Sequence, residues 1–196
     1  MALAAFRPYP DTNWDKGMFR GLFHDLFLLV REIAHAHPLW CLPIAAAIAF
    51  SESFVGISFI VPGTALLLTL GGVAGASHIP LWPAVLGATL GSIGGDWISW
   101  WIGFHYHHQI LHVWPFRRFE VQIEKGLYFF HKWGVAAIFL GRFTGPLRAT
   151  VPLVAGMSEL EFWPFQIANG ASAVIWAYVL LALPALATRV FVPLNF

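Results

Sequence analysis

The sequence has few charged residues and almost no cysteine. Only 11% of its 196 residues are Asp, Glu, Lys or Arg, whereas a typical soluble domain has about 25%. Hydrophobic residues make up 58% of the chain, so we predict a membrane protein with one compact membrane domain and no room for a large soluble domain. The single cysteine, Cys41, excludes an internal disulfide and a metal site built from cysteines.

Enzyme signatures are missing as well. The sequence contains no H-E-x-x-H, no G-x-S-x-G and no P-loop pattern G-x-x-x-x-G-K-[ST]. We therefore predict that the chain is not an enzyme and needs no cofactor. Its formal net charge of +1 gives no reason to expect nucleic acid as a partner.

Histidines cluster at positions 105, 107, 108 and 112, directly after a predicted membrane span. They lack an acidic or cysteine complement, and a closed metal site needs three or four converging ligands. We therefore expect no metal here. A pH-responsive surface fits these residues better, because imidazole titrates near neutral pH.

Residues 1–38 form a segment distinct from the rest of the chain. Between residues 18 and 37, apolar residues recur at spacings of three and four, which predicts an amphipathic helix at the membrane interface or on the bundle. Pro38 ends this helix. No apolar core followed by a small-residue cleavage site is present, so we expect no signal peptide. We assign residues 39–196 to the membrane domain.

Two apolar stretches of this domain are broken by proline next to glycine, at Pro62-Gly63 and at Gly145-Pro146. Proline removes a backbone donor and clashes with the preceding turn. Adding 81 to each residue number maps the pattern V-A-G-x-S-x-x-x-x-W-P at 73–83 onto the same pattern at 154–164. Paired broken segments in two halves of a membrane protein point to a binding site at the interface of the repeats.

Each broken stretch leads into an apolar span, at 81–104 and at 162–186, that is long enough to cross about 30 Å of hydrocarbon. We assign repeat 1 to about residues 50–104 and repeat 2 to about residues 133–186. If both broken stretches re-enter the membrane without crossing it, the repeats have opposite orientations. The predicted fold is an all-α membrane protein, an inverted repeat of two re-entrant helical hairpins, each followed by a transmembrane helix, after the amphipathic helix. Basic residues place 105–132 in the cytoplasm.

Two arginines, Arg142 and Arg148, flank the second break. A charged side chain at the bilayer centre costs about 3 kcal/mol or more, so it persists there only where protein or trapped water receives it. Two guanidiniums at the tip of a hairpin could grip a phosphate or a carboxylate bidentately. The alternative is an ordinary transmembrane helix whose arginines snorkel to the interface or pair with acids.

Three further polar residues lie in apolar surroundings. Glu52 is either a proton-carrying carboxylate or the partner of an arginine, and its alternative role is an interfacial helix cap. Asp96 has no nearby cation in the sequence, so it must meet an arginine or water from another segment or stay protonated. A purely structural Asp96–arginine pair is the alternative. Asn169 is a candidate ligand or a polar contact between helices worth about 1 kcal/mol.

Several of these motifs together resemble the DedA family of bacterial inner-membrane proteins, also called the SNARE-associated or VTT-domain group. They are Glu52 followed by PG, the GG-x-AG of residues 71–75, Gly95-Asp96, R-F-x-x-P-x-R at 142–148, and Asn169 before Trp176. The resemblance covers roughly residues 50–180. It implies two oppositely oriented re-entrant hairpins, a multi-pass protein of the bacterial inner (cytoplasmic) membrane, and movement of lipids such as undecaprenyl phosphate between leaflets.

This sequence departs from the family pattern at one position. Members of the family carry a second acid just after the first PG, whereas this chain has Thr64 there. The change removes a titratable group from the first hairpin and weakens the case for proton coupling at that position. Phosphate capture by the arginines is unaffected.

The leading hypothesis is a transporter that moves a phosphate-bearing lipid, undecaprenyl phosphate or a phospholipid, between the bilayer leaflets. We assign substrate binding to Arg142, Arg148, Thr64 and Asn169, and proton coupling to Glu52 and Asp96. One alternative is a proton-coupled small-ion or solute exchanger that titrates the two carboxylates. Another is a membrane scaffold whose buried charges only hold helices together. The expected partners are the lipid phosphate and the membrane, and the sequence leaves open whether copies form a homo-oligomer.

Overall fold

A computed structural model describes residues 32, 37–55, 57–58, 62–107, 109, 120–144 and 148–191. Every regular element of these residues is a helix, so the all-α class is confirmed for this part of the chain. The predicted helix over 18–37, apart from two of its residues, and the Gly145-Pro146 break lie outside the described residues. The elements are η1 (Pro38–Trp40), α2 (Cys41–Ser53), α3 (Gly63–Ala76), α4 (Trp82–Tyr106), α5 (Glu120–Trp133), α6 (Ala136–Gly141), α7 (Thr150–Met157) and α8 (Phe162–Phe191).

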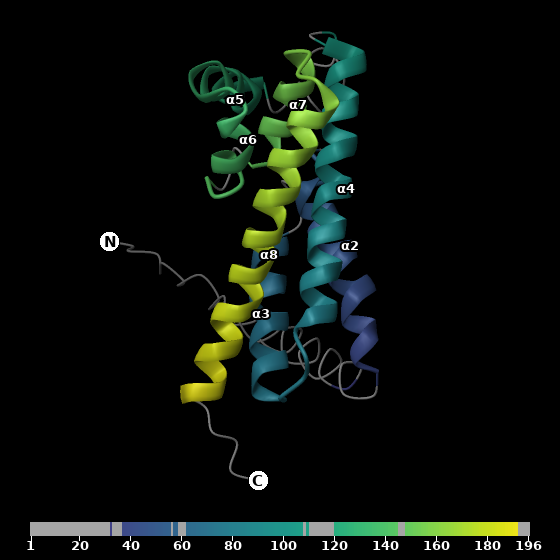
Figure 1. Ribbon diagram of the computed structural model, residues 1–196, viewed down its shortest axis with the longest axis vertical. Coiled ribbons are helices and arrows are strands. Elements are labelled where there is room, and N and C mark those ends of the chain that lie inside the picture. Colours follow the sequence, from purple (N-terminus) through teal and green to yellow (C-terminus); the bar gives the residue numbers. More distant parts are fainter. Residues whose placement is uncertain are drawn as a thin grey trace, which may run out of the picture.

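The frame of the molecule consists of two long helices, α4 and α8, which correspond to the two predicted membrane spans (Figure 1). They run antiparallel, because Trp100 stacks on Phe165 while the earlier Ile93 accepts a hydrogen bond from the later Asn169. Their 25 and 30 residues extend over about 37 and 45 Å at about 1.5 Å per residue. Among the described residues, α8 is the one helix that combines the length and the hydropathy needed to cross a membrane.

The short helices α3 and α7 pack on different long helices. A Cβ added to Gly75 of α3 would lie 2.4 Å from Ala185 Cα of α8. A Cβ added to Gly156 of α7 would lie 2.0 Å from the Trp100 carbonyl oxygen of α4. Each V-A-G element thus presses a glycine against the long helix of the other repeat, and the two short helices lie near opposite ends of the frame (Figure 1).

The repeat found in the sequence recurs in the backbone. Both α3 and α7 end in a Schellman turn, with a left-handed residue just after the helix: φ is 55° at His78 and 56° at Glu159, which are 81 positions apart. The closing hydrogen bonds match one for one, from the N–H groups of 77, 78 and 79 to the carbonyls of 73, 75 and 74, and from 158, 159 and 160 to 154, 156 and 155. The offset of 81 residues therefore relates two turns of the same conformation.

A row of glycines lets α2 approach α4 at backbone distance. A Cβ added to any of three glycines spaced four residues apart would lie between 2.0 and 2.8 Å from a backbone carbonyl oxygen of α2. The pairs are Gly87 with Leu42, Gly91 with Ala46, and Gly95 with Phe50. Small residues permit such contact between helices in membranes, where apolar burial alone gives little driving force. The packing holds the last turn of α2 against the middle of α4.

The remaining helices cover the end of the frame that carries α7 (Figure 1). On α5, Ile123 and Phe130 are buried in the same cluster as α7 residues, while Lys125 and Lys132 are exposed. Gly134, with φ of 55°, forms the turn between α5 and α6. The end of α6 then delivers Arg142 into the core.

The glycine row predicts a difference between two neighbouring substitutions in α4. Gly91→Ala places a methyl group 2.1 Å from the Ala46 oxygen, so the helices must separate, whereas a Cβ at Gly94 has no neighbour closer than 3.7 Å. We expect Gly91→Ala to lower the free energy of unfolding by about 1–3 kcal/mol. Gly94→Ala should be neutral or stabilising by up to about 1 kcal/mol, because alanine favours helix. Equal effects of both variants on unfolding in detergent would contradict this packing.

Candidate ligand-binding site

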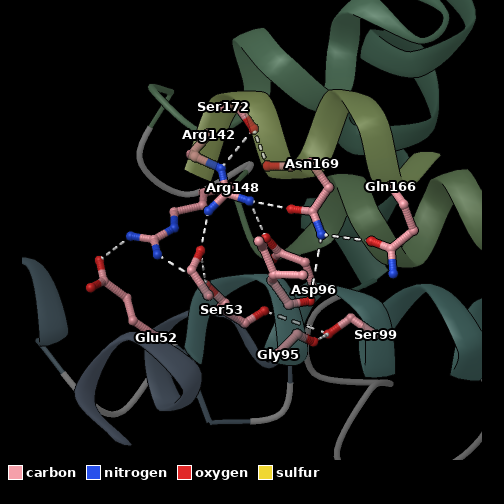
Figure 2. Close-up of polar contacts among 12 residues, drawn as sticks. Glu52, Ser53, Gly95, Asp96, Ser99, Arg142, Arg148, Gln166, Asn169 and Ser172 are labelled. Atoms are coloured by element: carbon pink, nitrogen blue, oxygen red, sulfur yellow. Dashed lines mark hydrogen bonds and ion pairs between the residues drawn. The ribbon is translucent and has the colours of Figure 1, made fainter. Parts of the chain in front are cut away.

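The six site residues predicted from the sequence lie together in the middle of the bundle, in two adjoining clusters. One is centred on Arg142 and the other on Arg148 (Figure 2). They come from different parts of the chain: Glu52 from α2, Thr64 from α3, Asp96 from α4, Arg142 directly after α6, Arg148 just before α7, and Asn169 from α8. Each arginine is paired with one of the two predicted carboxylates. Asp96 therefore meets an arginine from another segment, as one expectation had it, and Glu52 is an arginine partner.

The first cluster surrounds Arg142, whose side chain is only 3% exposed. Its Nε donates a hydrogen bond of 2.9 Å to the Ser172 hydroxyl, and Nη1 donates to the hydroxyl of Ser92. Nη2 donates both to Asp96 Oδ2 and to Asn169 Oδ1. Four hydrogen bonds thus hold a group that has five N–H donors. Arg142 joins α4 to α8 and is almost fully satisfied by protein.

Helical spacing explains how two helices supply these partners. Ser92 and Asp96 are four residues apart on α4, and Asn169 and Ser172 are three apart on α8, so each pair shares one face. Neither serine belongs to a motif that the sequence pattern marks as functional. A search for polar residues at spacings of three or four around each intramembrane acid or amide would have found them.

The second cluster surrounds Arg148, which is 6% exposed. Nη1 lies 2.6 Å from Glu52 Oε1, and Nη2 donates a 3.0 Å hydrogen bond to the Ser53 hydroxyl (Figure 2). The guanidinium carbon is 3.8 Å from the ring centroid of Trp176, a close cation–π contact. Glu52 Oε1 also accepts a hydrogen bond from the Thr64 hydroxyl. Glu52 lies in the last turn of α2, so it does not cap the start of that helix.

Two serine hydroxyls join the clusters. Ser53, which accepts from Arg148, donates a 3.2 Å hydrogen bond to Ser92, which accepts from Arg142. Ser53 is fully buried and packs against Gly95, the last glycine of the row that brings α2 onto α4. Nothing in the sequence pattern around Glu52 predicted this role of Ser53. The two arginines therefore belong to one continuous polar network.

The two arginines differ in how completely the protein satisfies them. Among the described residues, buried Nε and Nη1 of Arg148 have no hydrogen-bond partner, and the close Nη1 contact with Glu52 is an ion pair without hydrogen-bond geometry. Glu52 Oε2 is also unpartnered. Buried donors and acceptors left without a partner cost about 1–3 kcal/mol each. The Arg148 cluster therefore has unused capacity to bind a polar ligand.

A cavity opens beside this cluster. It has a volume of about 280 Å³ and is lined by both arginines, by Glu52 and Thr64, and by apolar side chains. The lining residues are Glu52, Thr64, Arg142, Phe143, Arg148, Trp176, Val179 and Leu180. A larger hollow of about 440 Å³ is lined by residues of α5 alone, and it has no buried charge. The cavity that holds the arginines is the candidate site.

The two described histidines of the predicted cluster, His105 and His107, take no part in this site. His107 Nε2 lies 3.0 Å from Glu159 Oε1, and both side chains are substantially exposed. His108 and His112 lie outside the described residues. Within the described part of the chain, no group of three or more His, Cys, Asp or Glu side chains could hold a metal ion.

Comparison with known sequences gives a family match. Residues 61–185 match the VTT domain. Inner membrane protein YabI of Escherichia coli K12 is 35% identical over 130 residues, which are 66% of this chain and 51% of YabI. Inner membrane protein YqjA of the same strain is 26% identical over 153 residues, with 69% of this chain and 62% of YqjA covered. The chain spans about half the length of the curated relatives it matches. No solved structure matches.

The buried Arg142–Asp96 pair predicts a strong non-additive effect on stability. Removing one partner leaves an uncompensated buried charge, so Asp96→Leu or Arg142→Met alone should lower the free energy of unfolding by about 3–5 kcal/mol. The double variant removes both charges and should recover much of that loss. The free energy of unfolding is measured in detergent for both single variants and for the double variant.

The exposed His107–Glu159 pair is the control, because each single alanine variant there should change stability by less than about 1 kcal/mol. If the double variant Asp96→Leu/Arg142→Met loses as much as the sum of its single variants, the two charges do not stabilise each other.

Proposed function

This chain belongs to the VTT-domain (DedA) family of membrane proteins, and on that basis we propose that it moves a phosphate-bearing lipid between the two leaflets of the bacterial inner membrane. YabI and YqjA carry the name inner membrane protein, which supports this location. The candidate substrates are undecaprenyl phosphate and phospholipids. The observation that carries the proposal is a buried guanidinium, Arg148, with unpartnered donors beside a cavity that has apolar walls.

The chemistry of the cavity matches an amphiphile. Arg148 offers a planar set of donors that suits phosphate oxygens. Phe143, Trp176, Val179 and Leu180 form the apolar part of the wall. A volume of about 280 Å³ is just below the range of ligand sites for drug-sized molecules, about 300–1,000 Å³. A phosphate headgroup therefore fits inside, while the acyl or prenyl tail stays in the surrounding lipid.

The two arginines have separate roles in this proposal. Arg142 is held by four hydrogen bonds and keeps α4 and α8 together. Its positive charge adds to the attraction for an anion, since it also lines the cavity. Arg148 makes the direct contact with phosphate, because its donors are free to do so. Asn169 accepts from Arg142 and acts on the substrate only through that arginine.

The proposed membrane placement follows from helix lengths. With 14 and 8 residues, α3 and α7 extend over only about 21 and 12 Å, less than the hydrocarbon thickness of about 30 Å. We therefore assign them to re-entrant hairpins that enter from opposite sides, with α4 and α8 as crossing helices in a multi-pass arrangement. The cavity then lies between the hairpin tips, where polar backbone is tolerated because it lines a protein cavity.

Reconstitution tests this function. Purified protein in liposomes that contain a fluorescent prenyl phosphate should speed the exchange of label between leaflets, measured with a membrane-impermeant quencher. Arg148→Lys keeps the charge but loses the planar fork, so we expect it to reduce the rate by about tenfold or more, with unfolding in detergent unchanged. Arg189→Lys, on the exposed last turn of α8, is the matched control and should keep the wild-type rate.

Two results would argue against lipid transport. Ion flux without lipid movement would favour the alternative of a proton-coupled exchanger that titrates Glu52 and Asp96. Loss of stability in Arg148→Lys equal to its loss of activity would favour a structural ion pair.

The inverted arrangement predicts opposite accessibility of two equivalent turns. Ser77 and Ser158 follow the V-A-G elements and end α3 and α7. In a Cys41→Ala background, Ser77→Cys should react with an impermeant maleimide added to intact cells. Ser158→Cys should react only after permeabilisation, because the basic segment before repeat 2 is assigned to the cytoplasm. Labelling of both positions from one side would exclude the re-entrant placement.

A further inference from the structure

The carboxylate of Glu52 lies at the start of a helix to which it does not belong. It accepts a hydrogen bond from the hydroxyl of Thr64, the second residue of α3. A Cβ added to Gly63, the first residue of α3, would lie 2.5 Å from Glu52 Oε2, so only glycine leaves room for the carboxylate there. Pro62, the N-cap residue, makes no side-chain capping bond. A helix N-terminus attracts anions through its unpaired N–H groups and its dipole.

Arg148 contacts the same carboxylate oxygen, Glu52 Oε1, that accepts from Thr64. Its Nη1 lies 2.6 Å from Glu52 Oε1, and Trp176 covers one face of the guanidinium. In the part of the chain that the structure describes, buried Nε and Nη1 of Arg148 have no hydrogen-bond partners, and Glu52 Oε2 has none either. The flat carboxylate of Glu52 therefore leaves N–H donors of Arg148 unused. The subsite around it combines this cation with the Thr64 hydroxyl and the N-terminus of α3. A tetrahedral phosphate has more oxygens with which to use them.

We propose that the Glu52 carboxylate is an internal stand-in for the ligand, and that the phosphate of the ligand displaces it from a subsite formed by Arg148, Thr64 and the N-terminus of α3. This inference rests on the proposed function and concerns how that site is filled and emptied. Arg148 stays paired with an anion before and after the exchange, so the buried guanidinium is never left without a counter-charge. The return of Glu52 to the subsite drives the phosphate out.

Thr64 has a specific part in this exchange. A hydroxyl donates to whichever anion occupies the subsite, whereas a carboxylate at this position would repel both phosphate and Glu52. The threonine therefore makes the first hairpin tip a better anion site. It supplies one of the donors that Glu52 uses in the empty state and phosphate uses in the bound state.

Binding measurements on detergent-solubilised full-length protein test the exchange. Inorganic phosphate and a short-chain prenyl phosphate are titrated into the wild type and variants, with the dissociation constant obtained by calorimetry and checked by thermal shift. Glu52→Gln removes the competing charge and should bind prenyl phosphate about tenfold tighter, the scale of one charged hydrogen bond. The same variant should move lipid more slowly. Thr64→Val should bind several-fold more weakly.

Two further proteins keep the result interpretable. Glu52→Asp retains the charge but is shorter by one methylene, so it competes less well and should also bind more tightly than the wild type. Glu52→Asp replaces Glu52→Gln in the binding test if Glu52→Gln does not fold. Glu159→Gln, an exposed carboxylate paired with His107, is the control and should bind like the wild type.

Each outcome decides the inference. Tighter binding by the Glu52 variants supports the inference. If both ligands bind more tightly, the site recognises the phosphate group by itself. If the prenyl phosphate alone binds more tightly, the ligand is the phosphate headgroup of a lipid. Equal or weaker binding by these variants, with lipid transport intact in the wild type, overturns the inference but leaves the proposed function standing. A wild type that neither binds nor moves lipid phosphate overturns both.

Discussion

Two guanidinium groups buried in an apolar bundle set the main physical constraint on this protein. Taking a charge out of water costs several kcal/mol, so each group must meet an anion and further hydrogen-bond partners at short range. Asp96 and Glu52 meet this need, one for each arginine. Their partners come from α2, α4 and α8, while the arginines themselves follow α6 and precede α7, so the charges can be compensated only when these elements are assembled.

Close helix packing makes that assembly possible. The glycine row of α4 brings the α2 backbone into direct contact, and this places Ser53 within hydrogen-bond reach of Ser92. In each repeat, the V-A-G glycine brings a short helix equally close to the long helix of the other repeat. Small residues and buried charges therefore depend on each other: without the close contact the polar side chains would not reach, and without the polar network the contact would gain little stability in a membrane.

The protein distributes its polar contacts unevenly, and we interpret this asymmetry as functional. Side chains of α4 and α8 accept four hydrogen bonds from Arg142, so its guanidinium is held in place, links the two helices and contributes positive charge. Arg148 is only partly satisfied and lies between Glu52, Trp176 and the cavity. Asp96 Oδ1 also lacks a partner among the described residues, but Asp96 does not line the cavity, whereas the unpartnered atoms of Arg148 and Glu52 belong to residues that line it. Unmet hydrogen-bonding capacity beside a cavity suits a ligand site.

The sequence by itself determined the membrane class, the all-helical fold of the described residues, the repeat at an offset of 81, and the six polar residues that meet in the core. These features are visible because hydropathy, helix-breaking residues and charges in apolar runs are local properties. Only the tertiary structure decided that Asp96 pairs with Arg142, 46 residues away, and that Glu52 pairs with Arg148. It also revealed the serine bridge, the contact of Trp176 with Arg148, and the position of Glu52 at the start of α3. Periodicity shows which residues share a face of one helix, but which faces meet depends on how closely the helices pack, and that is fixed by glycine contacts between distant segments.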